Sequence, residues 1–210
     1  MSTRTRTSAA LASIAGLTVA LLGAVPASAA SGSAAEDLSS RMDEMGVDRT
    51  TADAVVERFE GLPSADQRSF LAAFSADPTS VAEFGSTAAP EDPVSSASPL
   101  SRGSARYTAT YPVRVSVLGI DTGTFNLRYV FEATPTAVTR NLECTGWFSG
   151  TAGFWSVNET TSSYISVSTG TCKVIHRMSA VYKGSWWSAN KEQAVSYRGT
   201  VLSSGYLRNI

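Results

Sequence analysis

Histidine and cysteine are nearly missing from this chain. Its 210 residues include one histidine, His176, and two cysteines, Cys144 and Cys172. Protein metal centres are built from clusters of histidine, cysteine or carboxylate ligands. The sequence shows no such cluster, so we expect neither a metal nor another cofactor. It also lacks a glycine-rich phosphate loop and a G-x-S-x-G motif, the usual signatures of nucleotide binding and of many serine hydrolases.

Long hydrophobic runs are also scarce, and the only one lies near the start of the chain. Apolar residues 9–25 follow a basic start and end at Pro26, and small residues at 27 and 29 form a typical cleavage sequence. This order is typical of a secretory signal peptide, which we place at residues 1–29. No later run approaches the length that crosses a bilayer. We therefore expect a secreted, extracellular protein with no transmembrane segment in its mature chain.

The two cysteines fit an exported protein, because cysteine pairs outside the cell usually form disulfides. We predict a bridge between Cys144 and Cys172. Closing a loop of this size should stabilise the fold by roughly 3–4 kcal/mol in the chain-entropy model. A cysteine nucleophile is then excluded, because neither sulfur would be a free thiol.

Charge is unevenly distributed along the chain. Residues 31–99 hold 13 acidic and 4 basic residues, a net charge of −9, whereas residues 100–210 hold 5 acidic and 11 basic residues, a net charge of +6. The two parts could simply present different solvated surfaces. Alternatively they attract each other, or the basic part meets an anionic partner. Arginine outnumbers lysine 14 to 3, which indicates a bacterial source with a GC-rich genome rather than a particular chemistry.

Residues 30–85 are predicted to form a small acidic helical region. Apolar residues recur three and four positions apart, and glycine follows several of these runs. We expect helices to start at two capping boxes, Thr50-x-x-Asp53 and Ser64-x-x-Gln67. Such a short region makes a marginal core by itself. The apolar positions are Leu38, Met42, Met45, Ala52, Val55, Val56, Phe59, Phe70, Leu71, Phe74, Val81 and Phe84.

The rest of the chain is predicted to contain a linker and an all-β domain. Residues 86–104 are rich in proline and serine and have no periodicity, which is typical of a linker. Residues 105–210 alternate between apolar and polar side chains, with turn signals between the segments, which predicts an antiparallel β-sandwich or barrel. The fold class is thus α+β with segregated regions, a short helical region followed by the sandwich.

His176 is the residue on which an enzymatic reading would depend. It lies on the apolar phase of its segment, where the even positions from Cys172 to Tyr182 are the apolar ones. This favours a core histidine over a catalytic one. A Ser-His-Asp site would need His176 with Asp121 and a serine, and no motif supports that arrangement. The sequence therefore favours a protein that is not an enzyme, and we predict no catalytic residue and no metal ligand.

Two adjacent tryptophans, Trp186 and Trp187, are the strongest candidates for a binding surface. Neighbouring residues of a strand point to opposite faces. If the even apolar phase continues from Tyr182, Trp186 is buried and Trp187 is exposed. Exposed tryptophan beside cations suits sugar rings or anionic polymers. We therefore predict four ligand-binding residues, which are Trp187, Lys183, Lys191 and Arg198.

The leading hypothesis is a secreted, non-catalytic binding protein of the cell envelope or of extracellular polymers, whose partner is an anionic or glycan polymer. Exposed aromatic, arginine and lysine side chains would contact that polymer. One alternative is a secreted toxin or enzyme inhibitor in which the acidic helical region contacts and masks the basic β domain. A further alternative is a small hydrolase that uses His176.

Overall fold

The computed structural model describes residues 33–85, 92–96, 103–151, 153–182 and 185–210. The predicted signal peptide, residues 1–29, lies outside the described residues, as does most of the predicted linker, 86–104. All described residues belong to one compact unit, Gly32–Ile210. Among them, no helix combines the length and the apolar character needed to cross a membrane.

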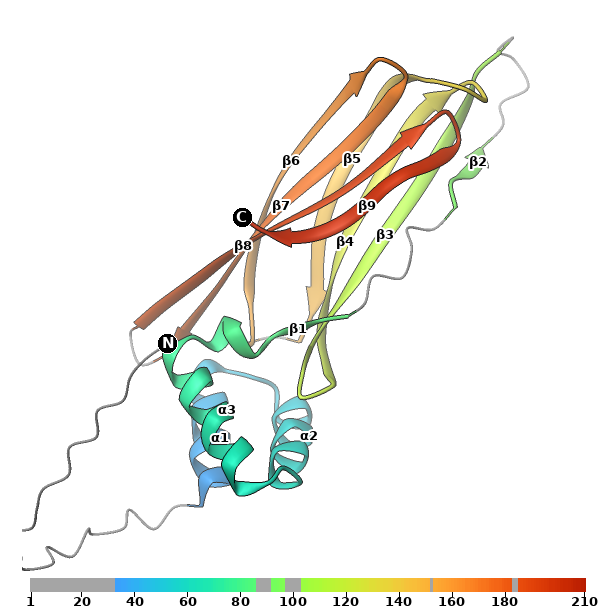
Figure 1. The fold of residues 1–210 in the computed structure, drawn as a ribbon. Helices are drawn as coiled ribbons and strands as arrows, with labels where there is room; N and C mark the ends of the chain where they lie inside the picture. The colour runs from blue at the N-terminus through green and yellow to red at the C-terminus, as the bar shows by residue number, and fades with distance from the viewer. Residues whose placement is uncertain (1–32, 86–91, 97–102, 152, 183–184) are drawn as a thin grey trace, which may run out of the picture. The chain divides into compact units, whose positions relative to one another are not determined.

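Three helices and a short 3₁₀ turn form the N-terminal part, as the apolar periodicity predicts (Figure 1). Leu38, Val55, Phe59 and Phe74 are fully or almost fully buried, which confirms the predicted apolar stripes. Gly46 ends the first helix in the left-handed conformation that glycine adopts at low cost. The elements are α1 (Ala34–Met45), α2 (Arg49–Glu60), α3 (Ser64–Ala76) and η1 (Pro78–Val81).

The two predicted capping boxes are wrong. The cap of α2 is Asp48, whose carboxylate accepts from the Thr51 amide at 3.0 Å. The residue before α3 is Pro63, which makes no side-chain cap. A complete box does occur at α1, where the Ser33 hydroxyl accepts from the Glu36 amide and the Glu36 carboxylate accepts from the Ser33 amide. A Ser-x-x-Glu or Ser-x-x-Gln pattern therefore forms a capping box only where the serine itself stays extended outside the helix, as Ser33 does, whereas Ser64 is already the first residue of α3.

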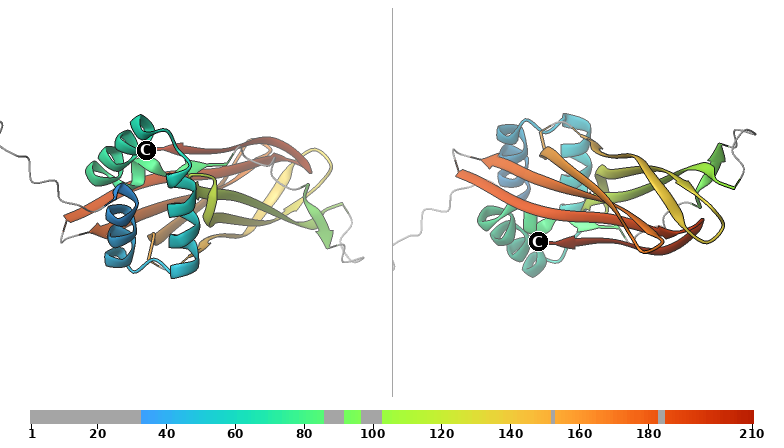
Figure 2. Two further views of the ribbon diagram at one scale, coloured as in Figure 1. Left: turned by 90° about the horizontal axis from the view of Figure 1, so that it is seen from below. Right: turned by 90° about the horizontal axis from the view of Figure 1, so that it is seen from above.

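Two antiparallel sheets follow the helices, which confirms the predicted fold class (Figures 1 and 2). In the five-stranded sheet, β3, β4 and β5 pair in order, and the short strands β1 and β2 both pair with β3. In the four-stranded sheet, β6, β7, β8 and β9 pair in sequence order. The strands are β1 (Glu83–Phe84), β2 (Val94–Ser96), β3 (Ala105–Val117), β4 (Ile120–Ala133), β5 (Val138–Gly150), β6 (Ser156–Ser166), β7 (Thr169–Tyr182), β8 (Ser185–Arg198) and β9 (Val201–Asn209).

The core is continuous between the sheets and the helices. Inward-facing Tyr111, Phe125 and Val174 of the sandwich belong to the same buried cluster as Phe59 and Phe74 of the helices. The sandwich therefore supplies the apolar partner that the helical region is too small to provide for itself. Strand β2 lies inside the predicted linker range and pairs with the start of β3.

The two ends of the sandwich differ, and we name them for what they carry. At the capped end the helices lie against the β3–β4 turn and the β5–β6 connection (Figure 1). There Leu118 shares a cavity wall with Ala54 and Leu62, and the hydroxyls of Thr51 and Thr151 are 3.4 Å apart. At the other end, which we call the turn end, the described connections are the tight turns of three hairpins, at residues 134–137, 167–168 and 199–200.

Candidate functional site

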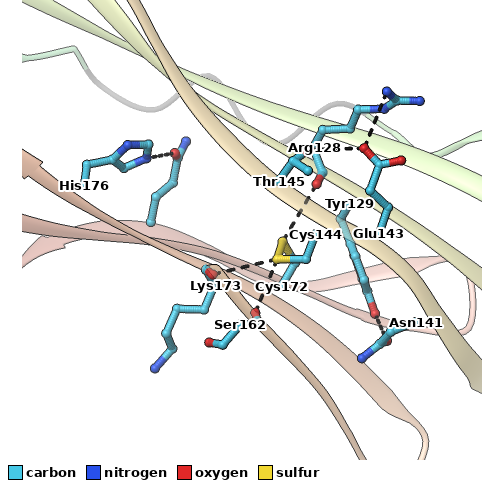
Figure 3. Close-up of a disulfide and its surroundings, with 11 residues drawn as sticks. Arg128, Tyr129, Asn141, Glu143, Cys144, Thr145, Ser162, Cys172, Lys173 and His176 are labelled. Atoms are coloured by element: carbon cyan, nitrogen blue, oxygen red, sulfur yellow. Dashed lines mark hydrogen bonds and ion pairs between the residues drawn. A yellow bond between two sulfur atoms is a disulfide. The ribbon is translucent and has the colours of Figure 1, made fainter. Parts of the chain in front are cut away.

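The predicted disulfide is present and joins the two sheets. Cys144 of β5 and Cys172 of β7 are bonded, with their Cα atoms 5.5 Å apart (Figure 3). Cys172 is completely buried. The bond thus crosses the core at the β5 edge of the five-stranded sheet, the side on which β5 continues into β6.

Trp187 is tied to the helical region. Its indole Nε1–H donates a 2.6 Å hydrogen bond to the carbonyl oxygen of Ala76, at the end of α3, and the side chain is half-buried. Trp187 pairs with buried Ala180 of β7, and paired residues of antiparallel strands share a face. The even apolar phase of β7 therefore does not continue through the turn into β8, where the odd positions face inward. The side chain of Trp186 lies outside the described residues.

The four predicted ligand-binding residues are not brought together. Lys183 lies outside the described residues. Lys191 and Arg198 lie seven positions apart on β8, so about 23 Å of extended strand separates them. Arg198 is exposed at the turn end, whereas Trp187 and Lys191 lie toward the capped end on the inward-facing phase. The binding role of these residues stays a prediction, and Lys191 and Arg198 line two separate cavities.

A polar row crosses the inner face of the four-stranded sheet. Glu159 of β6 pairs with His176 of β7, His176 pairs with Lys191 of β8, and Lys191 pairs with Asn209 of β9. The row is unusual because the inner face of a sandwich normally carries apolar side chains. Sequence reasoning identified Lys191 and His176 separately but did not place them side by side, because register across strands is not visible in the sequence.

His176 is the fully buried member of this row. Its Nε2 is 2.9 Å from the Gln193 side-chain oxygen, its ring centroid is 4.5 Å from that of Phe125, and its Nδ1 is 4.0 Å from a Glu159 carboxylate oxygen (Figure 3 shows His176). Burial lowers the pKa of His176, although the Gln193 contact opposes that effect. The histidine lines none of the described cavities. This geometry suits a core histidine better than a general base that must reach a substrate.

Lys191 follows His176 in the row and lies in the wall of an open groove of about 670 Å³. Only 7 % of its surface is exposed. Its ammonium lies 3.8 Å from the centroid of the Phe84 ring and donates to the Asn209 side-chain oxygen. Burial lowers the pKa of Lys191, while the nearby carboxylate of Asp77 acts in the opposite direction. The groove lies between the η1–β1 segment on one side and, on the other, the first half of β8 and the last residues of β9.

A second charged cluster covers the opposite face of the same strands. The Glu192 carboxylate accepts from Lys173 at 2.9 Å, from Arg208 at 2.6 Å and from the Tyr206 hydroxyl at 2.9 Å. Burial alone would raise the pKa of Glu192, but these three hydrogen bonds outweigh it and hold the pKa below its usual value. Because all three donors contact this one carboxylate on the sheet surface, we assign the cluster a structural role.

The described residues contain no group of three or more histidine, cysteine or carboxylate side chains placed to hold a metal ion. Comparison of the chain with family models, curated proteins and solved structures found no match in any of the three.

Proposed function

We propose that the protein is a secreted, non-catalytic binding protein of the cell envelope or of extracellular polymers, and that an anionic group of its ligand enters the groove beside Lys191. The disulfide is consistent with an oxidising compartment, and the pattern of residues 1–29 supports export. The groove lining includes the Lys191 cation, the Asp77 carboxylate and several hydroxyl side chains, without the assembled acid, base and nucleophile of a hydrolase.

The incomplete coordination of Lys191 is the observation that carries this proposal. An ammonium has three N–H donors. Among the described residues, Lys191 finds one hydrogen-bond acceptor, Asn209, and one aromatic face, Phe84, while the Asp77 carboxylate acts on it through space without a hydrogen bond. A largely buried charge is stable only when it is well paired. A carboxylate, sulfate or phosphate group in the groove would supply the missing acceptor and offset the desolvation of the lysine.

Retention of the mature chain on solid polymers tests the proposal. The probes are insoluble cell wall, chitin, cellulose and immobilised single-stranded DNA. We expect retention on an anionic probe and not on cellulose. Lys191→Met keeps an unbranched side chain beside Phe84 and removes the charge, and should weaken retention about tenfold, the effect of one charge-assisted hydrogen bond. Salt should weaken wild-type binding more steeply than binding of this variant.

Arg114→Gln is the matched control for Lys191→Met. Arg114 is exposed on β3 and makes only a loose ion pair with Asp121, with the two atoms 3.7 Å apart. Its removal changes the net charge by the same amount but leaves the groove intact, so retention should equal that of the wild type. Equal losses in both variants would show a general charge effect, and unchanged retention of Lys191→Met would contradict the proposed site.

The second candidate is a toxin or enzyme inhibitor masked by its helical region. The bond from Trp187 to Ala76 favours it, because the helical region covers part of the side chain that sequence reasoning expected on a binding surface. A specific protease site placed within residues 86–104 of the full chain tests this idea. Masking requires that the cut helical region dissociates and that inhibition or toxicity appears. Fragments that elute together and stay inactive would argue against it.

A further inference from the structure

Three hairpin turns meet at the turn end of the sandwich. The carbonyl of Ser168, in the β6–β7 turn, accepts a 3.0 Å hydrogen bond from the amide of Val138, which follows the β4–β5 turn. Gly199, in the β8–β9 turn, lies against the carbonyl of Pro135, where a larger residue would clash. The three turns therefore form one continuous surface, which lies away from the helices in Figures 1 and 2.

This surface is apolar to an unusual degree for exposed turns. Val167 is 99 % exposed and Val201 is 65 % exposed, and both lie at the hairpin turns. Tyr164 and Ile165, which lie near the end of β6 that leads into this turn, are also exposed. Turns normally carry polar residues or glycine. Large apolar side chains that gather on an exposed surface mark a contact with a partner or a membrane.

The backbone of Val167 makes its exposure more informative. Val167 has a φ of +58°, in the left-handed region that β-branched residues avoid. Leu118, in the β3–β4 turn, is the other described non-glycine residue with a positive φ, at +51°. Leu118 is partly buried and packs against the core, so its strain is offset within the fold. Val167 gains no such packing, and strain of this kind points to a function outside the fold.

The charge of the turn end favours an anionic surface. Residues 133–139, 164–171 and 198–205 contain one charged side chain, Arg198, and no carboxylate. A hollow of about 500 Å³ lies beside Val167, and Arg198 and the hydroxyl residues of both flanking strands line it. A guanidinium with several hydroxyl donors is a suitable set of partners for a phosphate group.

We propose that the turn end binds the surface of a phospholipid membrane that contains anionic lipid. Val167 and Val201 would enter the interface, Tyr164 would lie at the headgroup level, and Arg198 would contact a lipid phosphate. A few side chains at hairpin tips are too small an area for a stable pair of protein copies, which usually bury 20–30 residues on each side, about 800 Å² per partner. Binding to a membrane does not require a large surface of complementary shape, so a small apolar tip is sufficient for it.

The opposite end of the sandwich supports the same orientation. The described residues 33–85 of the capped end carry 11 acidic and 4 basic side chains, a net charge of −7. Anionic lipid repels such a surface and attracts Arg198. The three hairpin turns would thus contact the bilayer, and the helical region and the groove beside Lys191 would be directed away from it. This inference uses different residues from the proposed function and can fail independently of it.

Co-sedimentation of the mature chain with vesicles tests the proposal. The vesicles are phosphatidylcholine alone, or an equal mixture of phosphatidylcholine and phosphatidylglycerol. We expect clear binding to the mixed vesicles and weak binding to the neutral ones. Val167→Asn and Val201→Ser should each weaken binding about fivefold by removing an apolar side chain. Arg198→Gln should weaken binding to mixed vesicles about fivefold and abolish the preference for them.

The controls separate a membrane contact from a structural role. Asparagine tolerates a positive φ, so Val167→Asn should raise Tm by roughly 3 °C while it weakens vesicle binding, two effects that misfolding could not combine. Leu118→Asn makes the same exchange in the β3–β4 turn and should leave vesicle binding unchanged. Trp147→Ser removes a ring that is 43 % exposed on β5 and should also leave it unchanged. Lys191→Met tests the groove separately and should bind vesicles like the wild type.

Four results would overturn the proposal. The first is a wild-type chain that sediments with neither vesicle. The second is a set of turn-end variants that bind like the wild type. The third is a concentration-dependent dimer in analytical ultracentrifugation that Val167→Asn abolishes, because the partner would then be a second copy. Full competition by free glycerophosphate, with no effect of Val167→Asn, would likewise show a phosphate site in place of a membrane surface.

Discussion

Each end of the sandwich has one non-glycine residue with a positive φ, but the surroundings of the two side chains differ. Leu118 at the capped end and Val167 at the turn end both hold a large side chain at a positive φ, which destabilises the backbone by about 1–2 kcal/mol. At the capped end the side chain packs against the core, and burial compensates for the strain. At the turn end the side chain stays in solvent. The difference teaches that strain indicates function only where no contact in the fold compensates for it.

Removal of a core ring at the capped end should have the largest effect. Phe59 is fully buried in α2, with its ring centroid 5.7 Å from that of Phe70. Phe59→Ala should reduce the free energy of unfolding by about 3–5 kcal/mol. Because the core is continuous, urea transitions followed by helix circular dichroism and by tryptophan fluorescence should shift together. A shift of the helix signal alone would mean that the two regions unfold separately. Val56→Ala, partly buried on the same helix, should have a smaller effect.

The polar row should make stability depend on pH, although the turn end has no group that titrates near neutrality. The folded pKa of His176 is lowered from its usual value of 6.5, so below that pH the unfolded chain binds more protons than the folded one. Stability is therefore full above pH 6.5 and falls as the pH drops toward the folded pKa, by up to about 1.4 kcal/mol per pH unit.

Urea denaturation between about pH 8 and about pH 5 measures this effect. His176→Gln should be less stable at every pH but should show almost no slope over that range. An equal slope in the variant would assign the pH dependence to other groups. Glu192 contributes only at lower pH, because its folded pKa is also lowered and its unfolded pKa is near 4.5.

Loss of the hydrogen bond between Trp187 and Ala76 should have a moderate effect on the capped end. Trp187→Phe keeps an aromatic ring and removes the indole donor, so we expect a loss of about 1 kcal/mol. Trp147→Phe provides the control, because this side chain is more exposed, on the outer face of the five-stranded sheet. Thermal melting of both variants measures the difference. A loss that is equal in the two proteins would show that the contact with α3 adds no stability.

A change of similar size, but with opposite signs at the two ends, is expected at the strained turns. Val167→Asn should raise the free energy of unfolding by about 1 kcal/mol, because the strain disappears and no packing is lost. Leu118→Asn relieves the same strain but loses a partly buried apolar contact, so it should be destabilising. Differential scanning calorimetry of the two variants decides this. Destabilisation by Val167→Asn would mean that the exposed valine already has a packing role in the fold.

Much of the fold could be predicted from alternation within one segment. The even positions of β7 are buried as predicted, including Cys172, Val174 and Met178, because a strand with one face on the core must alternate. The disulfide followed from an isolated cysteine pair in a chain that we predict to be exported. The buried apolar stripes of the helices, for example at Leu38 and Phe59, could also be predicted, since helical periodicity is a property of the local sequence.

The candidate site could not be predicted in the same way, because it depends on register and on contacts between distant segments. Tyr182 pairs with Ser185, so the inward-facing positions are even in β7 and odd in β8, and Lys191 faces inward and pairs with His176. Phe84 and Asp77 reach the groove from a segment more than 100 residues earlier in the chain. Arg198 was selected for its nearness in sequence to Trp187, yet an extended strand carries it to the opposite end of the sandwich.

The bond between Cys144 and Cys172 also restricts how two copies of the protein could exchange parts. Strand β6 is an edge strand that pairs only with β7 in its sheet. Edge strands are the elements that most easily pair with a neighbouring molecule, including by domain swapping. All of β6 lies between the two cysteines. While the bond is intact, β6 belongs to a closed covalent ring that is anchored in both sheets, and it cannot leave its own molecule without opening that ring. The disulfide thus protects the protein against domain swapping, and a reducing environment removes that protection.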